Sequence, residues 1–171
     1  DSDTALVLDN NVLYIVNMLT EAVSSADIVS SSDLAISQST GSKVLIAHLE
    51  NTNSVSLYDF ISLFVSATLA PTDPTTHTSA FFVALDNDGV NDIFTTASSM
   101  NDGNLYLIVA EVQSGTFLNQ TGSILLDFEN AGGLDMFNNA AEALITDSDN
   151  DQVIRVNLST ENQTEIEVGD N

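Results

Sequence analysis

Three stretches of the chain carry apolar residues at helical spacing. In residues 10–23 apolar side chains recur every three to four positions, and Asp9 stands where a helix N-cap is expected. In residues 55–69 a narrow polar stripe interrupts an otherwise apolar surface, and Pro71 ends the pattern. Residues 134–145 repeat the helical spacing once more. The pattern therefore predicts three helices.

Shorter apolar runs, separated by Gly, Asn, Asp and Ser, predict strands in the rest of the chain. Apolar residues are nearly continuous in some runs and alternate with polar residues in others. The predicted strands are Ala5–Leu8, Asp27–Val29, Leu34–Ser37, Lys43–Leu49, Ser79–Leu85, Ile93–Thr96, Leu105–Val112, Ser123–Phe128, Ile154–Leu158 and Ile166–Val168.

The predicted strands outnumber the helices, and the two do not alternate regularly as they would in a doubly wound α/β fold. We therefore expect a mainly β fold, a β-sandwich of the jelly-roll kind with two or three added helices. An α+β arrangement is the alternative. No internal repeat of fixed period is evident. The length fits one domain over residues 1–171, with mobile or partner-exchanged ends at 1–9 and 160–171.

Charge restricts the function more than any motif does. The chain has 25 acidic residues against two basic ones, Lys43 and Arg155, and a formal net charge of −23. Such a surface repels nucleic-acid phosphates and anionic lipids. No apolar run reaches the roughly 18 residues of a membrane span. We therefore expect no nucleic-acid partner and no membrane insertion. The Ser, Thr, Asn and Asp surface is typical of exported proteins and of proteins from saline surroundings.

The composition gives little support to catalysis. The chain has no Cys, so thiolate chemistry and disulfides are excluded. No nucleophile motif such as G-x-S-x-G is present, and the absence of Trp leaves few platforms for stacking a sugar. A hydrolase that uses a carboxylate pair stays a minor alternative. We expect a non-catalytic protein.

The first candidate metal site is the loop Asp86-Asn87-Asp88-Gly89-Val90-Asn91-Asp92, between two predicted strands. Alternating carboxylates, a Gly for the turn and a later Asp suit a calcium site with oxygen ligands. Over about seven residues the loop resembles the calcium loops of FG-GAP and thrombospondin type 3 repeats. The resemblance implies Asp86, Asp88 and Asp92 as ligands, although Ala84 stands where those families have their leading Asp.

The second candidate is Asp147-Ser148-Asp149-Asn150-Asp151. Its carboxylates match positions 1, 3 and 5 of an EF-hand loop, so Asp147, Asp149 and Asp151 are predicted ligands. Gln152 and Leu158 stand where an EF-hand needs Gly and Glu, which excludes a complete EF-hand. Calcium is therefore the expected ion, with further ligands from elsewhere in the fold. A solvated acidic turn is the simpler alternative.

Other polar residues carry weaker signals. His48 and His77 are the two histidines, and structural roles suit them better than a zinc site. Lys43 fits an ion pair or an isopeptide crosslink, and Arg155 fits an ion pair with one of the many acids. Glycosylation sequons occur at Asn119, Asn157 and Asn162, about as often as chance would place them.

These observations favour an exported, non-catalytic structural subunit of an extracellular surface or matrix assembly, such as a filament or a layer. We expect it to self-associate as a homo-oligomer or polymer, with calcium relieving the charge repulsion between copies. A calcium-dependent adhesin or glycan-binding module is the first alternative. A capsid or decoration subunit of a virus from a saline host is the second.

Overall fold

A computed structural model describes residues 3–9, 11–28, 31–36, 43–48, 55–69, 77–86, 93–100, 103–113, 117–137 and 141–168. All regular secondary structure in these ranges is β-strand. The prediction of a mainly β fold is therefore confirmed, and none of the expected helices is present in the part of the chain that is described.

The strands form four antiparallel sheets. The first sheet contains β1 (Thr4–Asp9), β2 (Val12–Asn17) and β3 (Val23–Asp27). The second contains β4 (Ser31–Ile36), β5 (Lys43–His48), β6 (Val55–Asp59) and β7 (Phe64–Leu69). The third contains β8 (His77–Leu85), β9 (Ile93–Met100), β10 (Leu105–Gln113) and β11 (Phe117–Leu125). The fourth contains β12 (Ala131–Phe137), β13 (Glu142–Asp147), β14 (Gln152–Asn157) and β15 (Gln163–Glu167).

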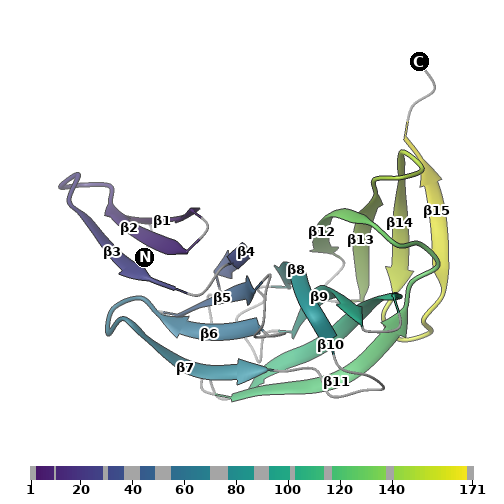
Figure 1. Ribbon diagram of the computed structural model, residues 1–171, viewed down its shortest axis with the longest axis horizontal. Coiled ribbons are helices and arrows are strands. Elements are labelled where there is room, and N and C mark those ends of the chain that lie inside the picture. Colours follow the sequence, from purple (N-terminus) through teal and green to yellow (C-terminus); the bar gives the residue numbers. More distant parts are fainter. Residues whose placement is uncertain are drawn as a thin grey trace.

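Each sheet is an up-and-down meander in which strands adjacent in sequence are adjacent in space. The four sheets follow one another in chain order along an open arc, with β4, β8 and β12 on its inside and β3, β7, β11 and β15 on its outside (Figure 1). Small meanders set side by side around a common centre are the blades of a β-propeller. The chain thus forms an arc of four propeller-like blades.

Each pair of consecutive sheets encloses its own hydrophobic core. The first core joins the first and second sheets, the second core joins the second and third, and the third core joins the third and fourth. Their largest buried side chains include Leu13 and Ile46 in the first core, Leu45 and Leu57 in the second, and Leu107 and Ile145 in the third.

Strand β5 shows why the interior sheets, meaning the second and third sheets, are rich in apolar residues. Val44 and Ile46 enter the first core, whereas Leu45 and Ala47 enter the second, and each is at most 1% exposed. Side chains alternate between the two faces of a strand, so a strand covered on both faces is apolar at most of its positions. The nearly continuous apolar run that predicted this strand is a consequence of that double burial.

The three predicted helices are wrong, and each is replaced by strands. Residues 10–23 contain β2 and the turn to β3, residues 55–69 form the hairpin β6–β7, and residues 134–145 span parts of β12 and β13. In a hairpin of two short strands, apolar residues from both faces and both strands can fall at helical spacing by coincidence. The β-branched and aromatic content was the better guide, because β2 contains Val12, Ile15 and Val16 together with Tyr14.

The predicted jelly roll also requires correction. A jelly roll has Greek-key connections that place distant strands side by side, but the four sheets contain only neighbouring strands in sequence order. The two predicted terminal strands do form. Thr4–Asp9 pairs with β2 and Gln163–Glu167 pairs with β14, both within the chain.

A recurring turn closes four of the hairpins, although no repeat was evident in the sequence. An Asn or Asp side chain at the end of a strand accepts backbone N–H groups two or three residues later, and the fifth residue has a positive φ. At Asn17, Oδ1 accepts the N–H groups of Leu19 (3.0 Å) and Thr20 (2.9 Å), and Glu21 has φ 57°. The same turn begins at Asp59, Asp147 and Asn157, with positive φ at Leu63, Asp151 and Glu161.

A polar contact also ties the second sheet to the third. The Asp33 carboxylate on β4 accepts the backbone N–H of Val83 on β8 at 3.1 Å and the N–H of Leu34 at 2.8 Å. Burial raises the pKa of Asp33, and the two backbone donors oppose this effect only in part. The inner edge strands of two sheets are thus linked by one carboxylate as well as by apolar packing.

Candidate functional site

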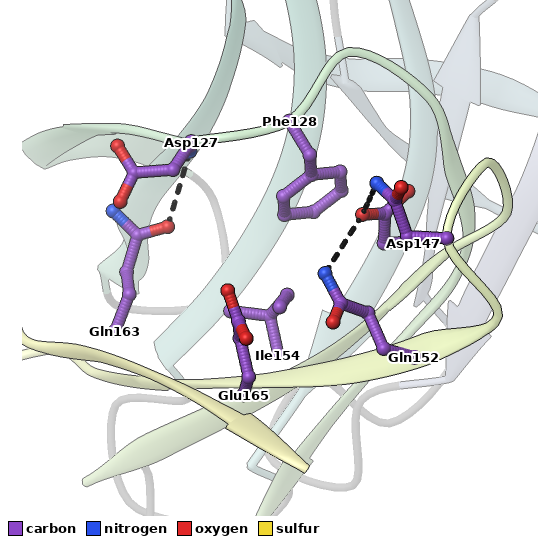
Figure 2. Close-up of a pocket in the computed structure, with 8 residues that line it drawn as sticks. Asp127, Phe128, Asp147, Gln152, Ile154, Gln163 and Glu165 are labelled. Carbon is purple, nitrogen blue, oxygen red and sulfur yellow. Dashed lines mark hydrogen bonds between the residues drawn. The ribbon is translucent and has the colours of Figure 1, made fainter. Parts of the chain in front are cut away.

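A pocket of about 390 Å³ lies between β14, β15 and the segment that follows β11. Its walls combine carboxylates, amides and two apolar side chains (Figure 2). Phe128 and Ile154 are nearly buried, at 9% and 5% exposed, and both belong to the third core. The lining residues are Asp127, Phe128, Asp147, Asn150, Gln152, Ile154, Gln163 and Glu165.

Asp147 is the most buried acid of this pocket, at 1% exposed. Its carboxylate accepts hydrogen bonds from Asn150 Nδ2 (2.7 Å), Gln152 Nε2 (3.1 Å) and the Asp149 backbone N–H (3.1 Å). Burial alone would raise the pKa of Asp147, but these donors together outweigh it and hold the pKa below its ordinary value. Asp147 is therefore an ionised residue that organises the β13–β14 turn.

On the opposite side of the pocket, Gln163 forms hydrogen bonds to the end of β11 and to the segment that follows it. Its side-chain Oε1 accepts the Asp127 N–H at 3.3 Å (Figure 2). Its Nε2 donates to the carbonyl oxygen of Leu125 at 2.9 Å. The exposed carboxylates of Asp127 and Glu165 remain at the rim. The pocket therefore presents exposed carboxylate acceptors beside two apolar side chains, which suits cations and hydroxyl-bearing ligands.

The second predicted calcium loop is the β13–β14 turn. Asp147 is bound by protein donors, and Asp149 accepts a hydrogen bond from Asn130 Nδ2 at 2.7 Å. Asp151 takes the positive-φ position of the turn. Over the described ranges no group of three or more His, Cys, Asp or Glu side chains is placed to hold a metal ion. Calcium binding by this loop stays a prediction, and the local geometry is that of a hydrogen-bonded turn.

The first predicted calcium loop follows β8. Asp86 is half-buried directly after that strand. Asp88 and Asp92 lie outside the described residues, so the loop as a metal site stays a prediction. Lys43 and His48 lie in β5 and His77 lies in β8.

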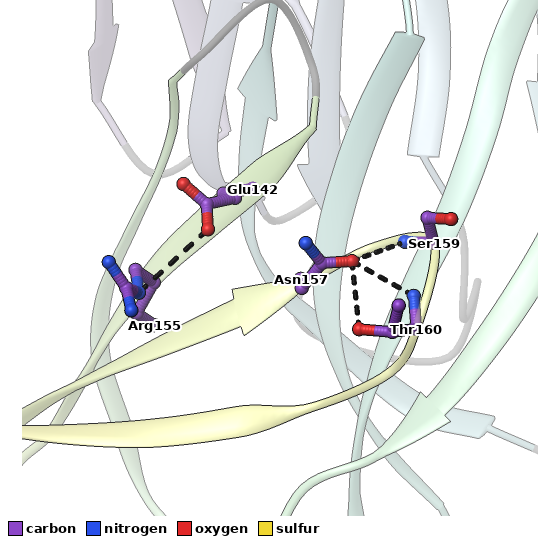
Figure 3. Close-up of polar contacts among 5 residues, drawn as sticks. All are labelled: Glu142, Arg155, Asn157, Ser159 and Thr160. Atoms are coloured by element: carbon purple, nitrogen blue, oxygen red, sulfur yellow. Dashed lines mark hydrogen bonds and ion pairs between the residues drawn. The ribbon is translucent and has the colours of Figure 1, made fainter.

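Arg155 forms an ion pair with an acidic residue, as the sequence predicts. Its Nε lies 3.8 Å from Glu142 Oε1, and the arginine side chain is 46% exposed (Figure 3). Among the sequons, Asn157 is committed to its turn, because its Oδ1 accepts the N–H groups of Ser159 and Thr160 and the Thr160 hydroxyl (Figure 3). Asn119 and Asn162 are exposed.

Sequence reasoning missed both the pocket and the outward faces of the first and fourth sheets. The pocket residues come from three separated segments, 127–128, 147–154 and 163–165, so no local motif could reveal it. The outward face of the first sheet had a signal, since β2 carries apolar residues on both faces, and in the described ranges only Leu13 and Ile15, on one face, belong to a core. Val7 and Val23 on the outward face are 50% and 60% exposed.

No helix in the described ranges has the length and apolarity needed to cross a bilayer. No protein-family model matches the chain, and no curated protein matches it. Among solved structures, 509 chains match. One of them, from the structure described as "Crystal Structure of Mitotic Checkpoint Complex", superimposes with a TM-score of 0.72 at 14% identity. The match covers 95% of this chain and 47% of that one, so the chain spans about half its length. At this identity the likeness concerns the fold alone.

Proposed function

We propose that this chain is an exported, non-catalytic structural subunit of an extracellular surface or matrix assembly. The observation that carries the proposal is the apolar character of the outward faces of the first and fourth sheets. On these faces Val7, Val23 and Ile166 are between 39% and 60% exposed. Exposed apolar faces of this kind mark interaction surfaces.

Charge supports an assembly that depends on ions. A net charge of −23 opposes any contact between copies at low ionic strength. Salt screens such repulsion over about 8–10 Å at physiological strength, and calcium can bridge carboxylates directly. We therefore expect association in saline and calcium-containing medium, as outside a cell.

The test is light scattering and negative-stain imaging of the purified chain in saline buffer, with calcium and then with chelator. Oligomers, filaments or layers support the proposal, and their loss with chelator assigns calcium a bridging role. A monomer in every salt and calcium condition contradicts it.

The acidic pocket favours a second candidate, a calcium-dependent binding module for glycans or other hydroxyl-rich ligands. Asp127 and Glu165 provide exposed acceptors beside Phe128, and amides line the wall. A glycan array probed with wild type and with Asp127→Asn and Glu165→Gln variants distinguishes this candidate. Binding that both variants lose supports it, and the absence of binding to any glycan with and without calcium contradicts it.

A further inference from the structure

The pocket between β14, β15 and the segment that follows β11 is lined by acids without a base. Three of its lining residues are acids, Asp127, Asp147 and Glu165, and none of them is basic (Figure 2). Arg155, the basic residue of the fourth sheet, is paired with Glu142 instead. Negative charge among the lining residues attracts cations, and the net charge of −23 reinforces this attraction.

The side-chain amides of the pocket wall use their nitrogen atoms within the protein. Asn150 Nδ2 and Gln152 Nε2 both donate to the Asp147 carboxylate, at 2.7 and 3.1 Å. Gln163 Nε2 donates to the carbonyl oxygen of Leu125 at 2.9 Å. Since an ionised carboxylate only accepts hydrogen bonds, the nitrogens of Asn150 and Gln152 face it, and their amide oxygens remain as acceptors. We therefore expect the ligand to supply hydrogen-bond donors.

Two apolar side chains of the wall favour an organic ligand. Phe128 and Ile154 line the pocket beside the acceptors. A hydrated metal ion gains nothing from such a wall, whereas the methylene groups of an organic ligand lose contact with water there. An aromatic ring also attracts a cation held over its face. The pocket volume of about 390 Å³ lies within the range of sites for small organic molecules, roughly 300–1,000 Å³.

We propose that this pocket binds a primary ammonium group carried on an apolar chain. The ammonium group brings three N–H donors and a positive charge to the carboxylates of Asp127 and Glu165 and to the amide oxygens. The methylene groups of the chain contact Phe128 and Ile154. A hydroxyl-rich ligand would bring donors without the charge. This inference concerns the pocket alone and does not depend on the self-association proposed above.

The first measurement is a titration of the isotopically labelled full chain, of 18.2 kDa, followed by NMR, which reports weak binding at single residues. Hexylammonium is the probe, and hexan-1-ol, which has the same chain without the charge, is its control. We expect hexylammonium to shift the backbone amide signals of residues 127–128, 150–154 and 163–165, and hexan-1-ol to shift them much less. Equal shifts with the alcohol, or no saturable shift with the amine, overturn the inference.

Variants that neutralise one acid locate the ammonium group. Asp127→Asn and Glu165→Gln keep the shape of exposed side chains, so the NMR spectrum away from the pocket should be unchanged. Each should raise the Kd of hexylammonium about threefold, and the double variant about tenfold, as expected for exposed charge pairs. Asp9→Asn is the matched control, because it removes one charge from an exposed residue of the first sheet and should leave the Kd unchanged. Equal effects of control and pocket variants overturn the inference, because net charge alone would then attract the cation.

Competition separates the ammonium group from a metal ion and from a sugar. Calcium chloride and maltotriose are added in turn to the chain with hexylammonium bound. We expect the amine to remain bound at millimolar calcium and in excess sugar. Displacement by calcium at these concentrations, with shifts of the same amide signals, overturns the inference in favour of a metal site. Displacement by maltotriose overturns it in favour of the glycan-binding candidate.

Two further probes distinguish the source of the ammonium group, since a free alkylamine and the lysine side chain of another protein share this chemistry. The amide of Nα-acetyllysine presents the side chain as a polypeptide does, and butylammonium has the same length of chain without the backbone. Tighter binding of the lysine derivative supports a partner protein as the source. Tighter binding of butylammonium supports a small amine. Binding of neither probe overturns the inference.

Discussion

The second sheet and the first sheet use similar strands in different surroundings. Strand β5 of the second sheet is apolar on both faces and buried on both, between the first and second cores. Strand β2 of the first sheet is almost as apolar, but only Leu13 and Ile15 enter a core. Two strands of similar apolar content therefore differ in burial because of the sheets that lie against them, which the strand sequence alone does not show.

The largest expected effect lies in the interior. Leu45→Ala in β5 removes a fully buried side chain of the second core and should lower the free energy of unfolding by about 2–5 kcal/mol. Chemical denaturation followed by circular dichroism measures it. Val23→Ala on the outward face of the first sheet is the comparison, with an expected change within about 0.5 kcal/mol for the monomer. Similar losses in both variants would mean that the outward face is already covered.

The next effect concerns the polar turn of the fourth sheet. Asp147→Ala leaves the side chains of Asn150 and Gln152 without their acceptor and should cost about 1–3 kcal/mol of stability. Asp149→Ala nearby is the control, because Asp149 is exposed and should cost less. If the two variants lose the same stability, the turn does not depend on the buried carboxylate. Addition of calcium tests whether either variant loses metal-dependent stabilisation.

A smaller effect tests the close packing of β12 on β13. A Cβ added at Gly132 would lie 2.9 Å from Thr146 Oγ1, so Gly132→Ala should cost about 1 kcal/mol in thermal or chemical unfolding. Thr146→Ala should cost little by itself and should relieve the strain in the double variant. Additive losses in the double variant would show that this contact is not the cause.

The smallest expected effect is a dependence on pH. The pKa of Asp147 is lowered by folding, so its ionised form contributes stability above the unfolded-state pKa, and this contribution is lost as pH falls through the folded-state pKa. The stability difference between wild type and Asp147→Asn should therefore be constant near neutrality and shrink in acid. Urea denaturation at a series of pH values measures it. A difference that stays constant into strong acid would mean that ionisation of Asp147 is irrelevant to the turn.

The local pattern of apolar residues was sufficient to predict those strands that are buried on both faces, because such strands are almost continuously apolar. The runs at Lys43–Leu49, Ser79–Leu85 and Leu105–Val112 correspond to β5, β8 and β10. The same pattern gave a wrong prediction for residues 55–69, because two short strands joined by a turn placed apolar residues at helical spacing. Asp59 belongs to the polar stripe of the predicted helix, whereas in the structure its side chain caps the β6–β7 turn.

In the candidate site, too, local spacing indicates some residues, whereas others are brought together only by the fold. The spacing of Asp147, Asp149 and Asp151 predicts calcium ligands, which stays a prediction, and Asp147 lies at the end of β13 in the wall of a pocket. Its partners within the pocket include Gln152, which stood against the EF-hand pattern and donates a hydrogen bond to Asp147. Residues 127–128 and 163–165 reach the same pocket only because the third and fourth sheets pack together.

By itself, the sequence determined that this protein is acidic, free of thiol chemistry, mainly β and rich in polar turns, because charge, residue types and alternation are local properties. Only the tertiary structure decided that the strands form sequential meanders along an arc, that Asp147 is buried in a network of donors, and that two apolar faces lie at opposite ends. These features depend on which segments meet across sheets, and contacts between residues far apart in sequence leave no local pattern from which they can be inferred.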